Sequence, residues 1–375
     1  MSNLFGKTWT RRELLEHVGD VTQLGGIRTS TLNDGNERGV RTVEMRTGTG
    51  LRFVVLPDRG MDIGEADFAG QSICWRSGTG DVAPAFFEST GRGWLRGFAG
   101  GLLTTCGLTY LGPAGTDDGE VLGQHGRVSY LPARNVLADG EWQSDEYVMW
   151  VQGKVSESTS VTPRLTLARK IMTRLGANSL TVEDRIENQG HSPSPFMMLY
   201  HFNFGFPLLG EETVLVSPTA SVVTADRQKM ENPDSYRRFQ KPAAGFQDSV
   251  LRHEVIPDAE GWVTVALINR ARQLGAYIRY RAAELPHLWQ WTMLGQGVYT
   301  VALEPANCWM EPRAEARKRG ELKFLAPGEV ANHRLEVGVC TSEEELQKLE
   351  EEISFSVRST RRVPLDASKS AFPAS

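Results

Sequence analysis

Short segments with the composition of β-strands recur along almost the whole chain. Each is rich in β-branched and aromatic residues, and turn-forming residues separate it from the next. The 38 glycines and 18 prolines supply the many tight turns that such a chain needs. This pattern predicts an all-β fold, either a sandwich or a barrel. The clearest of these segments are Leu51–Leu56, Arg164–Ala168, Ser179–Ile186, Gly261–Leu267, Gly275–Tyr280 and Val298–Leu303.

Two short helices are predicted, one near each end of the chain. Thr10 and Glu13 have the spacing of a capping box, in which a hydroxyl and a carboxylate each accept a hydrogen bond from the other residue's backbone amide. A second helix is expected to begin near Ser342. Acidic residues follow Ser342, and the positive end of the helix dipole favours them.

The length of 375 residues would allow two or three domains. However, no internal repeat and no linker rich in proline or serine divides the middle of the chain. We therefore expect one large β domain over residues 25–340. Residues 1–24 are expected to form an N-terminal helical extension. Residues 341–375 are expected to form a C-terminal helix followed by a poorly ordered tail from Ser356.

Composition limits the kinds of partner. The chain is 40% hydrophobic, too apolar for disorder, and its 41 Lys and Arg against 46 Asp and Glu give a net charge of −5. Without clustered basic residues, neither nucleic acid nor a membrane surface is an expected partner. The N-terminus has no apolar stretch of signal-peptide length and the chain has no run of about 20 apolar residues, which predicts a cytoplasmic protein. The four cysteines form no CxxC pair, so we expect buried free thiols rather than zinc or disulfides.

An aromatic stretch around His201 is the first candidate for a site. If residues 198–206 form a strand, His201 and Asn203 share one face with Leu199 and Gly205, and the aromatic residues at 200, 202, 204 and 206 share the other. The aromatic face is expected to be core and the polar face a binding site. The alternative is that His201 and Asn203 are hydrogen-bonded polar residues within a packed sheet.

Glu304 is the second candidate. It shares a strand face with Val298, Thr300 and Ala302, and Pro305 is expected to end that strand. Burying a carboxylate beside apolar residues is costly unless it is paired or functional. The functional interpretation is a general base whose pKa is raised by its surroundings, and the alternative is a salt-bridged glutamate at a sheet end.

His125 and Arg96 lie in glycine-rich segments. His125 precedes Gly126, which allows close approach of backbone or ligand. The segment 90–107 around Arg96 contains neither a P-loop nor a dinucleotide-binding motif, so a nucleotide is not expected. The Arg96 guanidinium could donate to ligand hydroxyls or phosphate, or instead pair with a nearby carboxylate.

The order of these motifs resembles the galactose mutarotase (aldose 1-epimerase) superfamily. The similarity extends over roughly residues 25–340 and is greatest to the branch known as domain of unknown function 4432. This resemblance implies a β-supersandwich whose concave sheet face holds a sugar. The motifs that carry it are Leu95–Gly101, Gln124–Gly126, Leu199–Asn203 and Leu303–Ala306, together with Leu56–Ile63 and Leu102–Leu108 for the branch.

The resemblance also implies roles for single residues. Glu304 resembles the family's general base, which takes the proton of the anomeric hydroxyl, and His201 the general acid, which protonates the ring oxygen. The two are expected on opposite sides of one acetal carbon, with no metal or redox cofactor. His125, Arg96 and Asn203 are expected to bind the substrate. The family's aspartate has no clear match, and Asp248 or Gln247 is the nearest replacement.

The predicted function is therefore an aldose or ketose 1-epimerase whose partner is a small sugar, acting as a monomer or a homodimer. Two alternatives from other classes remain. One is a sugar-binding or sensing protein on the same fold. The other is a metal-dependent isomerase or lyase that uses His125, His201 and Glu304 as ligands. A sugar-phosphate substrate would require basic residues near Arg96, for which the candidates are Arg59, Arg76 and Arg127.

Overall fold

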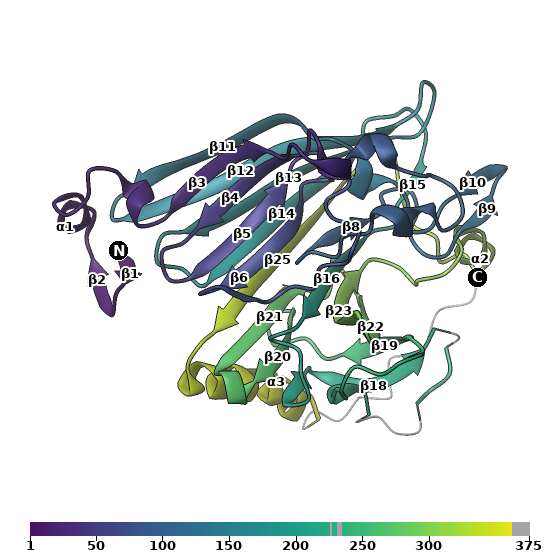
Figure 1. The fold of residues 1–375 in the computed structure, drawn as a ribbon. Helices are drawn as coiled ribbons and strands as arrows, with labels where there is room; N and C mark the ends of the chain where they lie inside the picture. Colours follow the sequence, from purple (N-terminus) through teal and green to yellow (C-terminus); the bar gives the residue numbers. More distant parts are fainter. Residues whose placement is uncertain (226, 231–234, 362–375) are drawn as a thin grey trace.

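The computed structural model describes residues 1–225, 227–230 and 235–361. Three large sheets dominate it, and within each of them neighbouring strands run antiparallel (Figure 1). An eight-stranded sheet forms one layer of a sandwich. A five-stranded and a six-stranded sheet together form the other layer, and apolar side chains from all three sheets meet in one core. The prediction of an all-β sandwich is confirmed.

The eight-stranded sheet contains four of the strand segments predicted from the sequence. Alternate residues of its central strand, from Ser179 to Asn188, are buried, as a half-buried strand requires. In spatial order its strands are β11 (Arg134–Gln143), β12 (Glu146–Ser158), β13 (Arg164–Arg174), β14 (Ser179–Asn188), β25 (Val330–Cys340), β21 (Leu274–Arg281), β20 (Trp262–Asn269) and β17 (Thr213–Val216).

In the second layer, the five-stranded and the six-stranded sheets are connected by a backbone bridge between Ile63 and Leu103. The five-stranded sheet has the order β3 (Gly26–Thr31), β4 (Arg41–Arg46), β5 (Leu51–Leu56), β6 (Asp62–Phe68) and β7 (Gln71–Ser72). The six-stranded sheet has the order β18 (Thr219–Thr224), β19 (Ser249–Val255), β22 (His287–Gly295), β23 (Val298–Ala306), β16 (Leu199–Gly205) and β8 (Thr104–Cys106).

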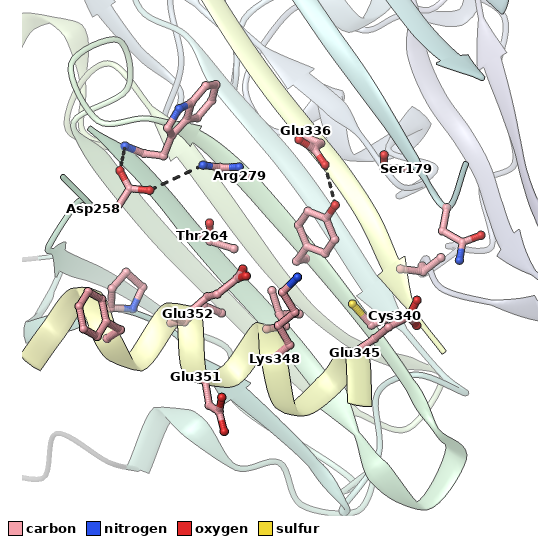
Figure 2. A pocket seen from close by; sticks show the side chains of 18 residues that line it. Ser179, Asp258, Thr264, Arg279, Glu336, Cys340, Glu345, Lys348, Glu351 and Glu352 are labelled. Atoms are coloured by element: carbon pink, nitrogen blue, oxygen red, sulfur yellow. Dashed lines mark hydrogen bonds and ion pairs between the residues drawn. The ribbon is translucent and has the colours of Figure 1, made fainter. Parts of the chain in front are cut away.

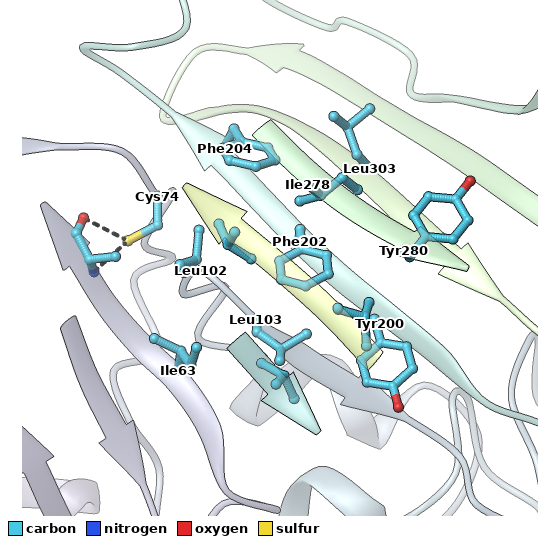
Figure 3. Close-up of a cluster of buried hydrophobic side chains, with 14 of the residues drawn as sticks. Ile63, Cys74, Leu102, Leu103, Tyr200, Phe202, Phe204, Ile278, Tyr280 and Leu303 are labelled. Atoms are coloured by element: carbon cyan, nitrogen blue, oxygen red, sulfur yellow. Dashed lines mark hydrogen bonds between the residues drawn. The ribbon is translucent and has the colours of Figure 1, made fainter. Parts of the chain in front are cut away.

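Strand β16 confirms the predicted division between a core face and a polar face. Tyr200, Phe202 and Phe204 point into the core between the layers, where they meet side chains from β21 and β23 (Figure 3). Phe206 does not continue this face: it lies past the end of β16 and is 66% exposed, because the strand stops at Gly205. The other face of β16 points away from the sandwich core and is free to form a site.

A buried ionic group connects the two layers beneath this sheet. The guanidinium of Arg169 on β13 lies 2.7 Å from the Asp184 carboxylate and 3.3 Å from that of Asp62 on β6. Tyr200 donates a hydrogen bond of 2.6 Å to the same Asp184 carboxylate. Burial raises the pKa of Asp62 to about 6, against the opposing effect of Arg169. Strand β16 is therefore anchored to the opposite layer by the hydrogen bond of Tyr200 to this ionic group, as well as by apolar packing.

The chain ends contain more structure than predicted. Thr10 and Glu13 form the predicted capping box at α1 (Arg11–Leu15), but a hairpin of β1 (Ser2–Leu4) and β2 (Lys7–Trp9) precedes it, so this segment is not helical alone. The second predicted helix is α3 (Glu343–Arg361). It includes residues 356–361, which the sequence assigned to the tail, and residues 362–375 lie outside the described residues.

The remaining elements are short. A helix that the sequence pattern did not predict, α2 (Arg313–Lys318), lies beside the hairpin of β9 (Gly115–Asp117) and β10 (Glu120–Leu122). A further small pair is formed by β15 (Ser194–Pro195) and β24 (Phe324–Leu325). The domain boundaries at residues 25 and 340 stay predictions.

The cysteines are all free thiols, as predicted, and Cys340 alone is not fully buried. Among the described residues, no helix has both the length and the apolar character to cross a membrane. The cytoplasmic location and the homodimer stay predictions.

Candidate active site

The polar faces of β16 and β23 bring His201 and Glu304 together. The two strands are neighbours, and the register that pairs Phe202 with Leu303 places His201 directly opposite Glu304. His201 Nε2 lies 3.1 Å from Glu304 Oε1. The expectation that the two groups lie on opposite sides of one acetal carbon is therefore not met, because cross-strand partners on one sheet face are adjacent.

Pro305 does not end its strand. It lies inside β23, where it is the register partner of Leu288 on β22. On its other side the pairing with β16 is interrupted between Leu199 and Phe202. Proline lacks the N–H that would continue the ladder. At Pro305, β23 is thus paired with β22 but not with β16.

Burial moves the pKa values of both groups in the direction that favours their neutral forms. Glu304 is fully buried, and its pKa is raised to about 8. Burial, and to a smaller extent the nearby His125, lowers the pKa of His201 to about 3. At neutral pH the pair therefore carries one transferable proton and no net charge.

Polar atoms without partners gather at this pair. Eleven buried side-chain atoms of the described residues lack a well-aligned hydrogen bond. Four of them belong to residues that line this site, and a fifth belongs to Asn203 behind it. They are both carboxyl oxygens of Glu304, Nδ1 of His201, Nδ1 of His125 and Oδ1 of Asn203. Unsatisfied buried polar atoms are rare in folded proteins, and the four on the lining residues are placed to bond a polar ligand or water.

His125 approaches the pair from a loop. Its backbone has a φ of +58°, and Gly126 next to it has a φ of +76° and bridges to Gly107 beyond the end of β8. The ring of His125 lies 4.8 Å from that of Trp94 and 6.3 Å from that of His201, measured between centroids. Burial lowers the pKa of His125 to about 4, so its imidazole is neutral at neutral pH.

These residues line a cavity of about 490 Å³, which suits a small ligand. Aromatic rings surround His201: Phe98 lies 5.3 Å and Trp291 5.7 Å from its centroid. Flat apolar side chains of this kind are suited to the C–H face of a sugar ring. The complete lining is Arg92, Trp94, Leu95, Phe98, Pro113, Ala114, Gln124, His125, His201, Asp248, Val250, Trp291, Glu304 and Met310.

Of the seven site residues predicted from the sequence, four line the cavity: Glu304, His201, His125 and Asp248. Asp248 accepts a hydrogen bond of 2.9 Å from the Trp291 indole.

The other three predicted residues do not line the cavity. Asn203 is fully buried behind it, where its amide donates to the carbonyl oxygens of Gly101 and His201. The side chain of Arg96 is 74% exposed and pairs with Glu88 at 3.1 Å. Gln247 is exposed, and its amide donates to the carbonyl oxygen of Gly245.

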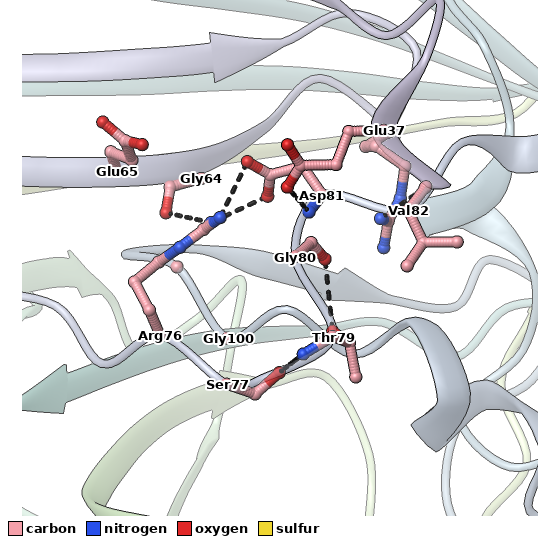
Figure 4. A network of polar contacts seen from close by, with 12 residues as sticks. Glu37, Gly64, Glu65, Arg76, Ser77, Thr79, Gly80, Asp81, Val82 and Gly100 are labelled. Atoms are coloured by element: carbon pink, nitrogen blue, oxygen red, sulfur yellow. Dashed lines mark hydrogen bonds and ion pairs between the residues drawn. The ribbon is translucent and has the colours of Figure 1, made fainter. Parts of the chain in front are cut away.

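The three arginines considered for a phosphate all have partners elsewhere. Arg59 donates to three backbone carbonyls, Arg76 pairs with Asp81 at 2.7 Å (Figure 4), and Arg127 lies 3.3 Å from Glu120. In the described part of the chain, no group of three or more His, Cys, Asp or Glu side chains is arranged to hold a metal ion. The metal-dependent alternative therefore gains no support.

A larger cavity of about 830 Å³ lies between α3 and the eight-stranded sheet (Figure 2). Some of its polar groups are linked to one another: Arg279 lies 3.7 Å from Asp258, and Tyr277 donates a hydrogen bond of 2.6 Å to Glu336. Two of its buried polar atoms, Asn178 Oδ1 and Arg279 Nε, have no hydrogen-bond partner among the described residues. None of the site residues predicted from the sequence lines it. The smaller cavity, with its buried acid–base pair, is the candidate active site.

Comparison with known families agrees with this architecture. The family model described as domain of unknown function DUF4432 matches residues 37–339. The chain belongs to the DUF4432 family. No match was found among curated protein sequences.

Solved structures show what this DUF4432 protein is similar to. A putative aldose 1-epimerase from Klebsiella pneumoniae has 25% sequence identity and a TM-score of 0.84, covering 94% of this chain and 96% of that one. A galactose mutarotase-like protein from Clostridium acetobutylicum has 12% identity and a TM-score of 0.58, with coverage of 84% and 99%. A galactose 1-epimerase from Lactobacillus acidophilus has 12% identity and a TM-score of 0.54, also with coverage of 84% and 99%. The predicted galactose mutarotase-like fold is confirmed.

Sequence reasoning missed several cavity residues of this DUF4432 protein. Arg92, Trp94 and Phe98 lie in the same glycine-rich segment as Arg96, but the pattern offered no reason to prefer one arginine over the other. Residues 93–97 form a 3₁₀ turn. Arg92, which precedes this turn and is exposed, lines the cavity together with the buried Trp94, whereas Arg96 pairs with Glu88. The only signal in the sequence was that Arg92 and Arg96 flank Trp94, which does not say which arginine lines the cavity.

Proposed function

We propose that this protein is a 1-epimerase that interconverts the anomers of a free aldose or ketose without a cofactor. The observation that carries this proposal is the contact of 3.1 Å between His201 Nε2 and Glu304 Oε1 in the wall of a cavity of sugar size. Anomer exchange requires one proton to leave the anomeric hydroxyl and one to reach the ring oxygen. These two oxygens are bonded to the same carbon, so adjacent acid and base groups suit them.

In the proposed reaction the protein contributes only proton transfers. With the shared proton on His201, the Glu304 carboxylate takes the proton of the anomeric hydroxyl, and His201 gives its proton to the ring oxygen. The bond between the anomeric carbon and the ring oxygen breaks, and a carbonyl forms at the anomeric carbon. Rotation about the adjacent carbon–carbon bond exposes the other carbonyl face. The reverse proton transfers then close the ring to the other anomer.

The two pKa shifts support the pairing rather than opposing it. In the empty site the neutral acid Glu304 and the neutral imidazole His201 hold the same single proton that the reaction needs. Transfer of that proton across 3.1 Å converts the pair to carboxylate and imidazolium, with no exchange with solvent. Sugar hydroxyls that donate to the unpartnered Glu304 oxygens would stabilise the carboxylate form.

The remaining lining suits sugar binding. His125 and Asp248 present polar groups to the cavity, and Trp94, Phe98 and Trp291 provide apolar walls. The same lining would also serve a sugar-binding protein without activity. The two functions differ in whether bound sugar changes its anomeric form.

The deciding experiment is NMR exchange spectroscopy on a panel of aldoses and ketoses at anomeric equilibrium, with and without the protein. Accelerated exchange between anomers, unaffected by a metal chelator, supports the epimerase. Calorimetric binding of a sugar with unaccelerated exchange would favour the binding protein instead. Activity that chelator abolishes and a divalent metal restores would favour the metal-dependent alternative.

A further inference from the structure

The candidate cavity has opposite charges at its two ends. Asp248 immediately precedes β19, and the strand order β19, β22, β23, β16 places it three strands away from His201. At about 4.8 Å per strand, the two backbones are roughly 14 Å apart. The Asp248 carboxylate lies nearer, because it accepts a hydrogen bond from the Trp291 indole, whose ring is 5.7 Å from that of His201. Arg92 belongs to the opposite end, because its turn is tied to the loop of His125, which lies beyond His201.

The turn that carries Arg92 is held firmly in place. The amide of Gln124, the residue before His125, donates to the carbonyl oxygen of Gly91 at 2.9 Å. On the other side of Arg92, the amide of Gly93 donates to Thr90 at 2.9 Å. A Cβ at Gly93 would lie 2.5 Å from the Glu88 carbonyl oxygen, so this close turn requires glycine. Arg92 is thus presented to the cavity by a turn of defined shape.

The guanidinium of Arg92 is available to a ligand. It is the one basic side chain, Lys or Arg, in the cavity lining, and within the described residues no ion pair or side-chain hydrogen bond engages it. Arg96, four residues further on, is held by Glu88. An arginine beside a cavity without a carboxylate of its own is suited to an anion on the ligand.

The proposed chemistry decides which part of a sugar meets Arg92. If the anomeric hydroxyl lies at Glu304 and the ring oxygen at His201, the ring carbons after the anomeric carbon extend toward Asp248. The carbon bonded to the ring oxygen, with its exocyclic substituent, then extends past His201 toward His125 and Arg92. Hydroxyl donors thus meet the carboxylate of Asp248, and the exocyclic group meets the cation.

We propose that the preferred substrate is a hexuronic acid, an aldose with a carboxylate on its exocyclic carbon. This inference rests on the proposed function. A planar guanidinium binds one carboxylate through two parallel hydrogen bonds. A phosphate dianion would call for further cations, but Arg59, Arg76 and Arg127 are engaged by other groups.

The test compares three hexuronates, D-glucuronate, D-galacturonate and D-mannuronate, each with its parent hexose and with that hexose's 6-phosphate. Anomer exchange by NMR gives kcat/KM for each. We expect one hexuronate to exceed its parent hexose by roughly 10- to 100-fold, the value of a charged hydrogen-bonded contact. Arg92→Gln should reduce this ratio by a similar factor, mainly through KM, and the matched variant Arg96→Gln should leave it unchanged.

The outcomes separate this inference from the proposed function. Faster exchange of every parent hexose, or of a 6-phosphate, would overturn the hexuronate preference while leaving the epimerase in place. A ratio that Arg92→Gln does not alter, or that Arg96→Gln alters equally, would overturn the role of Arg92. If no sugar is exchanged, calorimetry with the three hexuronates still decides: binding that weakens roughly tenfold in Arg92→Gln supports anion recognition, and absence of binding refutes it.

Discussion

His201 Nε2 and Glu304 Oε1 lie 3.1 Å apart on adjacent strands, on the face of the six-stranded sheet that points away from the sandwich core. Both groups are buried, and burial shifts their pKa values past each other, to about 3 for His201 and about 8 for Glu304. One proton therefore serves both residues. A pair of titratable groups displaced from their ordinary pKa values beside a cavity is a mark of a functional site.

Glu304→Gln tests the base directly. We expect kcat for anomer exchange to fall by about 10²- to 10⁴-fold, because the amide keeps the shape of the carboxyl group and loses its proton chemistry. Glu284→Gln is the matched control, since burial raises the pKa of Glu284 too but that residue does not line the cavity. Equal rates for Glu304→Gln and the wild type, measured by NMR exchange, would remove Glu304 from the mechanism.

Glu304 should also make stability depend on pH. Below pH 4.5 the carboxyl group is protonated in both states, and between pH 4.5 and about 8 the unfolded chain releases the proton while the folded protein keeps it. The contribution of Glu304 to stability should therefore fall as pH rises through this range and level off above about 8, whereas the lowered pKa of His201 acts in the opposite direction below pH 6.5. Urea unfolding at several pH values should show Glu304→Gln gaining stability relative to the wild type with rising pH. A difference that is independent of pH would contradict the shifted pKa.

Arg169→Met tests the ionic group between the layers. Its removal leaves the carboxylates of Asp62 and Asp184 buried without their cation. A loss of about 3–5 kcal/mol in the free energy of unfolding is expected. The control is Arg185→Met on the same sheet, where the arginine is 51% exposed and its pair with Glu187 should matter little. Similar losses in the two variants would argue against a special role for the buried group.

Gly126→Ala tests the loop that presents His125. A Cβ at Gly126 would lie 2.3 Å from the Tyr110 carbonyl oxygen and 2.5 Å from that of Gly107. Gly119 has a similar φ, +78° against +76°, with no atom near its Cβ position, so Gly119→Ala carries the same backbone strain without the clash. We expect Gly126→Ala to lose about 1–3 kcal/mol more than Gly119→Ala in urea unfolding. Its anomer exchange should slow as His125 is displaced, whereas a variant indistinguishable from Gly119→Ala would show that the loop adapts.

Much of the fold followed from short-range patterns. The alternation in β16 separates Tyr200, Phe202 and Phe204 from His201 in the sequence alone, because a strand turns successive side chains to opposite faces. The capping box at Thr10 was likewise readable, since both of its hydrogen bonds lie within one turn of chain. The prediction that Pro305 ends its strand was wrong, because the effect of a proline depends on which edge of the strand is paired.

The sequence by itself determined which residue types carry chemistry and which face of each strand they occupy, because side-chain direction follows from local backbone geometry. Only the tertiary structure decided that His201 meets Glu304, since that contact depends on the register between two strands far apart in the chain. It also decided that Arg92, and not Arg96, lines the cavity, because the path of a glycine-rich turn is set by the loops that pack against it. Long-range register and loop packing lie beyond any local pattern, and in this protein they assemble the site.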